Sequence, residues 1–141
     1  ALRIVNEAAY EEDPQLNIRS KEAEFPVTNP FMQEIIRPRN IGFEKDGELY
    51  ITSRINYAEI GSAKIITIPG EALPNIGFYL KRKMDTDHPF LFGLTNDAYG
   101  YILTEVDYDS FDRYNYISRT SLGEYTGSIL IKTALDLLEN P

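Results

Sequence analysis

The sequence predicts an α+β fold, or an irregular α/β fold, in which a mixed β-sheet has about three helices packed on it. Three observations indicate this class. Apolar and polar residues alternate over 48–60, an almost wholly apolar, β-branched run follows over 63–68, and apolar residues recur at helical spacing over 73–83 and 126–139. Because strands and helices do not alternate strictly, a doubly wound parallel sheet is not expected.

The N-terminal third predicts one strand and one helix. Apolar and polar residues alternate imperfectly over 16–27, which indicates a strand that ends at Pro26. Asn29 can then cap a helix whose first position is Pro30, where the missing N–H costs nothing. This helix is expected to run to about Ile36.

The middle of the chain predicts two strands joined by tight turns. Asp46-Gly47 is a hairpin signal, and Gly61-Ser62 marks the next turn. In the strand over 48–60, one mostly apolar face is formed by Leu49, Ile51, Ser53, Ile55 and Tyr57. The apolar run over 63–68 is expected to be a strand covered on both faces.

The C-terminal half predicts two of the helices and two short strands. The helices are expected over about 73–83 and 126–139. A short buried strand is expected over 90–94 and a further strand over 99–103. The polar, aromatic segment over 105–119 is expected to be a loop.

Composition excludes several classes of function. The chain has 141 residues, enough for one domain, and its net charge of −8 provides no basic surface for a nucleic acid. It has no cysteine, so disulfides, thiolate nucleophiles and cysteine metal sites are excluded. No apolar stretch reaches the roughly 18 residues that a membrane-spanning helix needs.

Two motifs about thirty residues apart hold the candidate metal ligands. The first, over 65–71, ends on Glu71, and the second, over 93–101, ends on Tyr101. Each passes from a hydrophobic strand through a glycine-containing turn to a polar side chain, a place where α/β proteins often keep their chemistry. Glu71 is either a cap at the start of the following helix or a metal ligand, and Tyr101 either packs or directs its hydroxyl into a cleft.

Other candidates are fewer. His88 is the single histidine, so this chain alone is not expected to form a complete zinc site, and a surface position is expected for His88. Tyr114 and Tyr116 belong to the polar, aromatic segment, which is either the rim of a substrate site or a solvated loop.

The motifs resemble the C-terminal part of the catalytic domain of the neutral/alkaline ceramidase family, and most of all its uncharacterised prokaryotic branch. The similarity covers about residues 45 to 130. It rests on Thr-Ile-Pro-Gly-Glu over 67–71, Gly-Leu-Thr-Asn over 93–96, Tyr-x-Tyr-Ile-x-Thr over 99–104, the strand over 54–61, and Tyr116 with Thr-Ser-Leu-Gly over 120–123.

This resemblance implies a zinc-dependent amidase. By the family's pattern, Glu71 and Tyr101 match two metal ligands, and Tyr116, with Tyr114 second, matches a tyrosine that polarises the amide carbonyl. Two histidine ligands of the family have no counterpart here, and Ile117 stands where the family has a glutamate after that tyrosine. The resemblance therefore implies that 1–141 is the C-terminal portion of a larger catalytic domain, with zinc bound only in the intact protein.

Three functional hypotheses follow. In the first, the chain joins a missing N-terminal part of the same protein, and the intact protein hydrolyses a small-molecule or lipid-like amide. In the second, it is a non-catalytic α+β binding or interaction module that retains the fold without activity. In the third, it is a structural half-domain whose apolar face docks onto the missing part. The first two are separated by whether Glu71 and Tyr101 converge in an open cleft.

Overall fold

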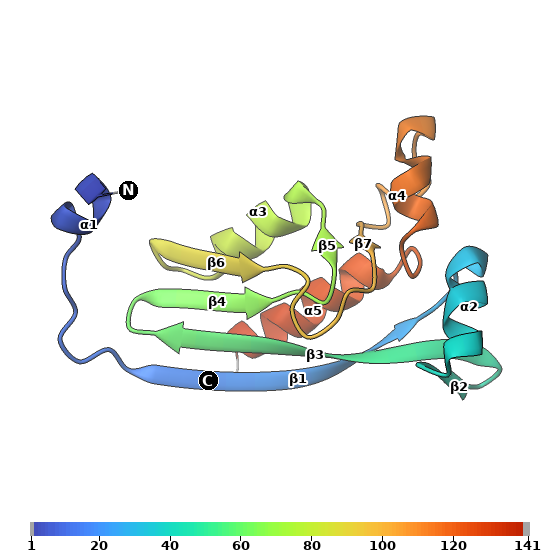
Figure 1. The fold of residues 1–141 in the computed structure, drawn as a ribbon, viewed down its shortest axis with the longest axis horizontal. Helices are drawn as coiled ribbons and strands as arrows, with labels where there is room; N and C mark the ends of the chain where they lie inside the picture. Colours follow the sequence, from blue (N-terminus) through green and yellow to red (C-terminus); the bar gives the residue numbers. More distant parts are fainter. Residues whose placement is uncertain (1, 140–141) are drawn as a thin grey trace.

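The computed structural model describes residues 2–139 and contains one five-stranded sheet and one two-stranded sheet (Figure 1). The main sheet has the order β1-β3-β4-β6, with β2 paired to the N-terminal end of β3. All neighbours are antiparallel except β4 and β6, which are parallel. The strands are β1 (Leu16–Pro26), β2 (Phe43–Lys45), β3 (Glu48–Ile60), β4 (Ala63–Thr67) and β6 (His88–Phe92).

The three expected helices are present, and the α+β class is confirmed. They are α2 (Pro30–Ile36), α3 (Pro74–Lys83) and α5 (Thr126–Glu139). The described chain also contains shorter helical segments that the sequence did not predict: α1 (Leu2–Glu7), α4 (Asn115–Arg119), and the 3₁₀ turns η1 (Arg37–Arg39) and η2 (Asp112–Tyr114). No helix within residues 2–139 is both long enough and apolar enough to cross a membrane.

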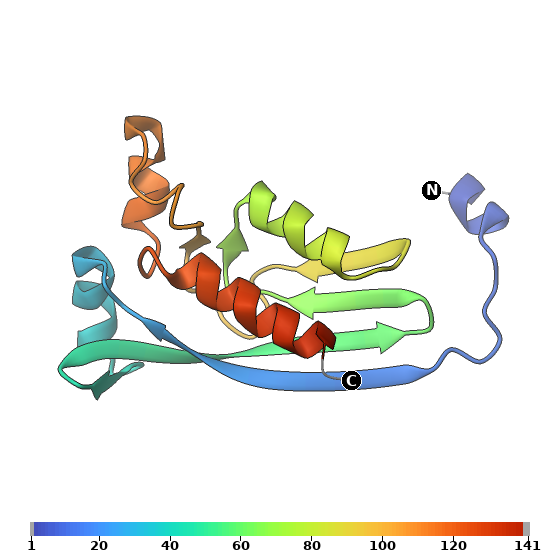
Figure 2. The same ribbon diagram turned by 180° about the vertical axis from the view of Figure 1, so that it is seen from behind.

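The alternating pattern of β3 places its apolar face in the core. Leu49, Ile51, Ser53, Ile55 and Tyr57 are all buried, as predicted. The apolar ones among them belong to the core cluster that also contains residues of α3 and α5, two helices that lie together on one side of the main sheet (Figure 2). The β2–β3 turn adopts positive φ at both Asp46 and Gly47, which matches the twist of the two strands.

The opposite face of the main sheet is not covered by any helix of the described chain; it faces the reader in Figure 1. On β4, Ile66 is fully buried whereas Ile65 is only half-buried. On β6, Phe90 and Phe92 are 46% and 48% exposed. The predictions that 63–68 is covered on both faces and that 90–94 is buried were therefore wrong, because α3 and α5 cover one face only.

A single buried amide joins the start of α2 to the segment between α4 and α5. The Oδ1 atom of Asn29 accepts a hydrogen bond from Phe31 N (3.0 Å), which confirms the predicted cap. Its Nδ2 group donates to the carbonyl oxygens of Ser118 (3.0 Å), Arg119 (2.9 Å) and Ser121 (2.7 Å). Asn29 therefore caps a helix start, and its two N–H bonds are shared among three carbonyl oxygens.

The substitution Asn29→Ala should lower the free energy of unfolding by about 2–4 kcal/mol, because it removes a cap and the side-chain donor of the buried Ser121 carbonyl group. Asn29→Asp keeps an oxygen at the cap but places a carboxylate among three carbonyl oxygens. We expect it to be at least as destabilising in urea denaturation. An Asn29→Asp variant as stable as the wild type would show that the amide donor contributes nothing.

Candidate functional site

The two predicted metal ligands lie on neighbouring strands. Strand β5 (Glu71–Ala72) pairs in parallel with β7 (Tyr101–Ile102), and Glu71 is the direct register partner of Tyr101. Side chains of directly opposite residues project from the same face of a sheet. Glu71 is exposed and Tyr101 is half-buried. The two motif ends therefore meet at one accessible place on the surface.

Two glycines allow the backbones to approach this closely. Glu71 N donates to Gly100 O (2.9 Å), and a Cβ atom added to Gly70 would overlap the same carbonyl oxygen. Gly100 has a φ of +84°, and a Cβ atom there would overlap the carbonyl oxygen of Thr120. Tyr101 N donates to that oxygen as well (3.2 Å). Three chain segments are thus joined at the site by main-chain contacts.

Tyr116 joins this group, whereas Tyr114 does not. From α4, the ring of Tyr116 packs edge-on against Tyr101, with ring centroids 5.9 Å apart and planes at 69°. Tyr116 is 68% exposed, so the residue is accessible to a ligand. The ring of Tyr114 instead contacts Phe111 and Arg113. Of the two tyrosines predicted to polarise a carbonyl, only Tyr116 contacts a predicted metal ligand.

The expectation that Glu71 could be a helix cap was wrong. The cap position of α3 is Leu73, which makes no side-chain capping bond, and the helix begins at Pro74. Glu71 precedes the cap and belongs to β5. The Glu71 side chain does not cap the helix, and it remains exposed beside Tyr101.

The loop before Tyr101 is anchored to the main sheet by side chains that the sequence did not identify. Asp97 accepts a hydrogen bond from Ser53, the polar residue on the buried face of β3. Asn96, with a φ of +73°, donates to Arg54 O (2.7 Å). Burial, and then the neighbouring Asp97 carboxylate, raises the pKa of Tyr99 to about 12. The Asn96-Asp97 pair was the sequence signal that could have predicted this fixed turn, since both residue types stabilise turns.

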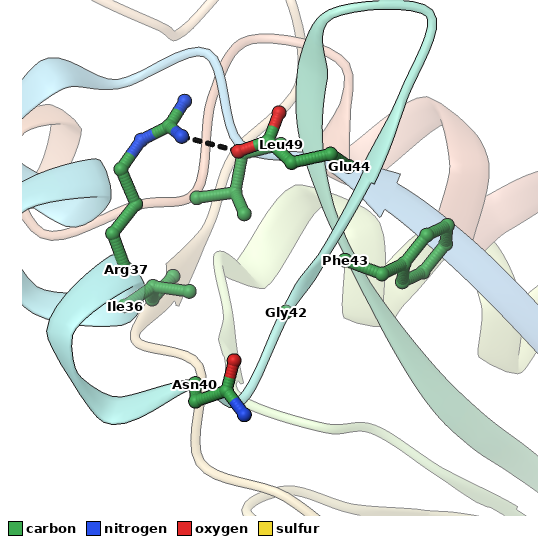
Figure 3. A pocket seen from close by; sticks show the side chains of 7 residues that line it. All are labelled: Ile36, Arg37, Asn40, Gly42, Phe43, Glu44 and Leu49. Atoms are coloured by element: carbon green, nitrogen blue, oxygen red, sulfur yellow. Dashed lines mark hydrogen bonds and ion pairs between the residues drawn. The ribbon is translucent and has the colours of Figure 1, made fainter.

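A shallow hollow of about 520 Å³ lies beside Glu71. Its walls are mostly apolar and include Ile68, Leu73, Leu91 and Leu94. A second hollow, of about 350 Å³, lies between α2 and β2 and is closed on one side by the Arg37–Glu44 ion pair (Figure 3). None of the predicted site residues lines the second hollow, so only the first is relevant to Glu71.

The residues of this chain fit part of a zinc site. A carboxylate and a phenol are suitable oxygen donors, but a structural or catalytic zinc usually takes three or four protein ligands, histidine among them. Within residues 2–139, no group of three or more His, Cys, Asp or Glu side chains is placed to hold a metal ion. His88 is exposed and begins β6. Strands β4 and β6 begin side by side at His88 and both run towards Glu71. His88 and Glu71 therefore lie at opposite ends of these strands.

Comparisons with known proteins indicate which fold this is. No family model and no curated protein matches the chain. Among solved structures, the neutral ceramidase from Pseudomonas aeruginosa aligns over 89% of this chain, with a TM-score of 0.57 and 15% identity. A ceramidase complexed with C2 aligns over 62%, with a TM-score of 0.54 and 19% identity. The chain spans 29% and 14% of the lengths of these two proteins. It therefore has a ceramidase-like fold corresponding to a minor part of each.

The glycine at position 100 provides a test of how the site is assembled. Gly100→Ala should destabilise the protein by more than about 2 kcal/mol, because the new methyl group combines a positive φ with overlap on Thr120 O. Gly47→Ala is the matched control: its φ is +82°, but nothing lies within 4 Å of the added Cβ. The control should cost only about 1 kcal/mol in urea denaturation. Equal losses would contradict the close approach at Thr120.

Proposed function

We propose that this chain is one portion of a zinc-dependent amidohydrolase, in which Glu71 and Tyr101 supply two metal ligands and a further part of the same protein supplies the others. The observation that carries the proposal is the direct register pairing of Glu71 with Tyr101, with the Tyr116 ring against Tyr101. The ceramidase-like fold supports the same reading. The proposed substrate is a small-molecule or lipid-like amide.

The chain's own residues have distinct proposed roles. Bound zinc would polarise an amide carbonyl and lower the pKa of a water molecule. Glu71 contributes a charged oxygen donor, and Tyr101 contributes a phenolic oxygen at the same face of the β5–β7 pair. Tyr116 is accessible and contacts Tyr101, so its hydroxyl can donate to the oxyanion that develops on the carbonyl oxygen. Tyr114 is the second candidate for that role.

The small number of metal donors in this chain supports one alternative, a binding module without activity. Since the described residues hold no group of three His, Cys, Asp or Glu side chains around one point, the chain can also be a binding module that retains the fold without activity. The two functions predict different behaviour of the same glutamate. In the binding module, the Glu71 carboxylate is dispensable for metal content because no metal is bound.

Zinc content separates the two functions. In the polypeptide that the gene encodes, Glu71→Gln should lower bound zinc, measured by mass spectrometry of the metal, by at least about tenfold, since loss of an outer-sphere partner alone costs 10–100-fold. Glu34→Gln is the control, because Glu34 is an exposed carboxylate on α2, away from the site. Absence of zinc from the wild-type protein, or full zinc in Glu71→Gln, would reject the amidohydrolase proposal.

The two tyrosines provide a second test. Tyr116→Phe should reduce hydrolysis of an acyl amide by about 10²-fold while leaving zinc content unchanged, because it removes an oxyanion donor but no metal ligand. Tyr114→Phe should change the rate by less than about threefold, since the Tyr114 ring contacts Phe111 rather than Tyr101. A larger loss in Tyr114→Phe than in Tyr116→Phe would reverse the two assignments.

A further inference from the structure

The uncovered face of the main sheet has an apolar half and a charged half. Across β1, β3, β4 and β6, the register aligns Ile18, Ala58, Ile65 and Phe90 in one row. Ile18 is 63% exposed and Phe90 is 46% exposed. A row of four apolar residues directed away from the core is unusual for a mostly antiparallel sheet with one solvated face.

The neighbouring rows extend this surface on both sides. Leu16 and Ile60 are paired beyond the central row, and Phe92 follows Phe90 on β6. We use the name apolar half-face for the surface formed by Leu16, Ile18, Ile60, Ile65, Phe90 and Phe92. Beyond the ends of β4 and β6 the same face becomes charged, with Glu22 opposite Arg54 and Glu24 bound to Lys45 of β2. The change occurs where β4 and β6 end.

The polar row between the two halves needs no outside partner. Ser20 donates to Asn56 Oδ1 (2.8 Å), and Asn56 N donates to Thr67 Oγ1 (2.9 Å). Asn96 adds a weaker contact to the same Thr67 oxygen (3.4 Å). Because these groups satisfy one another, a partner gains binding energy from the apolar half-face alone. That partner must therefore present an apolar layer.

The size of the apolar half-face favours a partner within the same polypeptide. Its side chains expose on the order of 600 Å² of apolar surface, the upper end of what a monomer shows. Pairing it with an equal surface buries about 1,200 Å² in all, which is the bottom of the range for separate chains but well inside the range for contacts within one chain. A tethered segment also gains from a high effective concentration.

The position of the half-face relative to the candidate site completes the argument. Strands β4 and β6 both run towards the turns that lead to Glu71 and to the loop before Tyr101. A layer packed on the half-face therefore ends beside the incomplete donor set. In addition, the chain spans only 29% of the Pseudomonas aeruginosa neutral ceramidase, so a protein of that length has ample further chain to supply such a layer.

We propose that the apolar half-face is the docking surface for a further, apolar segment of the same polypeptide, which reaches the Glu71–Tyr101 pair from the strand exits. The inference shares with the proposed function the premise that this chain is one portion of a larger protein. It does not depend on the metal. A second copy of this chain is the competing occupant.

Thiol accessibility tests the proposal cleanly, because the chain has no cysteine of its own. Single variants Ile18→Cys and Phe90→Cys place a thiol on the half-face, and Phe78→Cys places one on α3, where the native side chain is 64% exposed. In the isolated 141-residue chain, all three should react with a disulfide reagent at rates within about threefold of one another. In the polypeptide that the gene encodes, Ile18→Cys and Phe90→Cys should react at least about tenfold more slowly than Phe78→Cys.

Three outcomes would overturn the proposal. The first is equal reaction rates for all three variants in the gene-encoded polypeptide, and the second is a gene-encoded polypeptide no longer than these residues. The third is a stable dimer of the isolated chain, seen in sedimentation velocity, that Phe90→Glu dissociates. The last would assign the half-face to a second copy. Protection of the half-face thiols requires no zinc, so it can succeed where Glu71→Gln shows that no metal is bound. Conversely, a zinc-binding protein with reactive thiols would leave the proposed function intact and reject the docking surface.

Discussion

Main-chain contacts among three segments hold the candidate site together. Gly70, Gly100 and Thr120 approach one another so closely that a side chain at either glycine would overlap a carbonyl oxygen. These contacts bring β5, β7 and the residue after α4 to one place. Because the backbone makes the arrangement, the side chains of Glu71 and Tyr116 need not be buried to keep their positions. A site assembled in this way can remain accessible to a ligand without losing its geometry.

Coverage of the main sheet by helices on one face only determines much of the remaining structure. The buried face is apolar except for positions such as Ser53, where Asp97 provides the hydrogen-bond partner. Burying a hydroxyl without a partner costs free energy, so this bond both satisfies Ser53 and ties the loop before Tyr101 to β3. The Ser53–Asp97 bond therefore links the buried face of β3 directly to the loop that precedes Tyr101.

The sequence predicted those parts of the fold that depend on local pattern. The alternation in β3, the Asn29-Pro30 helix start and the Asp46-Gly47 turn each follow from neighbouring residues. The exposure of Phe90 and Phe92 could not be predicted, because an apolar strand gives no sign of which face will be covered. The short α4 was missed because five residues carry too little periodicity. The motifs placed Glu71 and Tyr101 at strand exits, but their register is a long-range property that no local pattern contains.

The open face of the sheet and the exposure of the candidate site have a common explanation under the two proposals. Tyr116 is exposed in this chain, so water competes for its hydroxyl and a hydrogen bond from it to an oxyanion would be weak. A segment docked on the apolar half-face would shield the strand exits from water. The same donor would then stabilise developing charge far more strongly, because electrostatic interactions increase as the local dielectric constant falls. Under the two proposals, docking would supply both the further ligands and the dry environment, so the isolated chain is expected to be inactive even though Glu71, Tyr101 and Tyr116 already lie together.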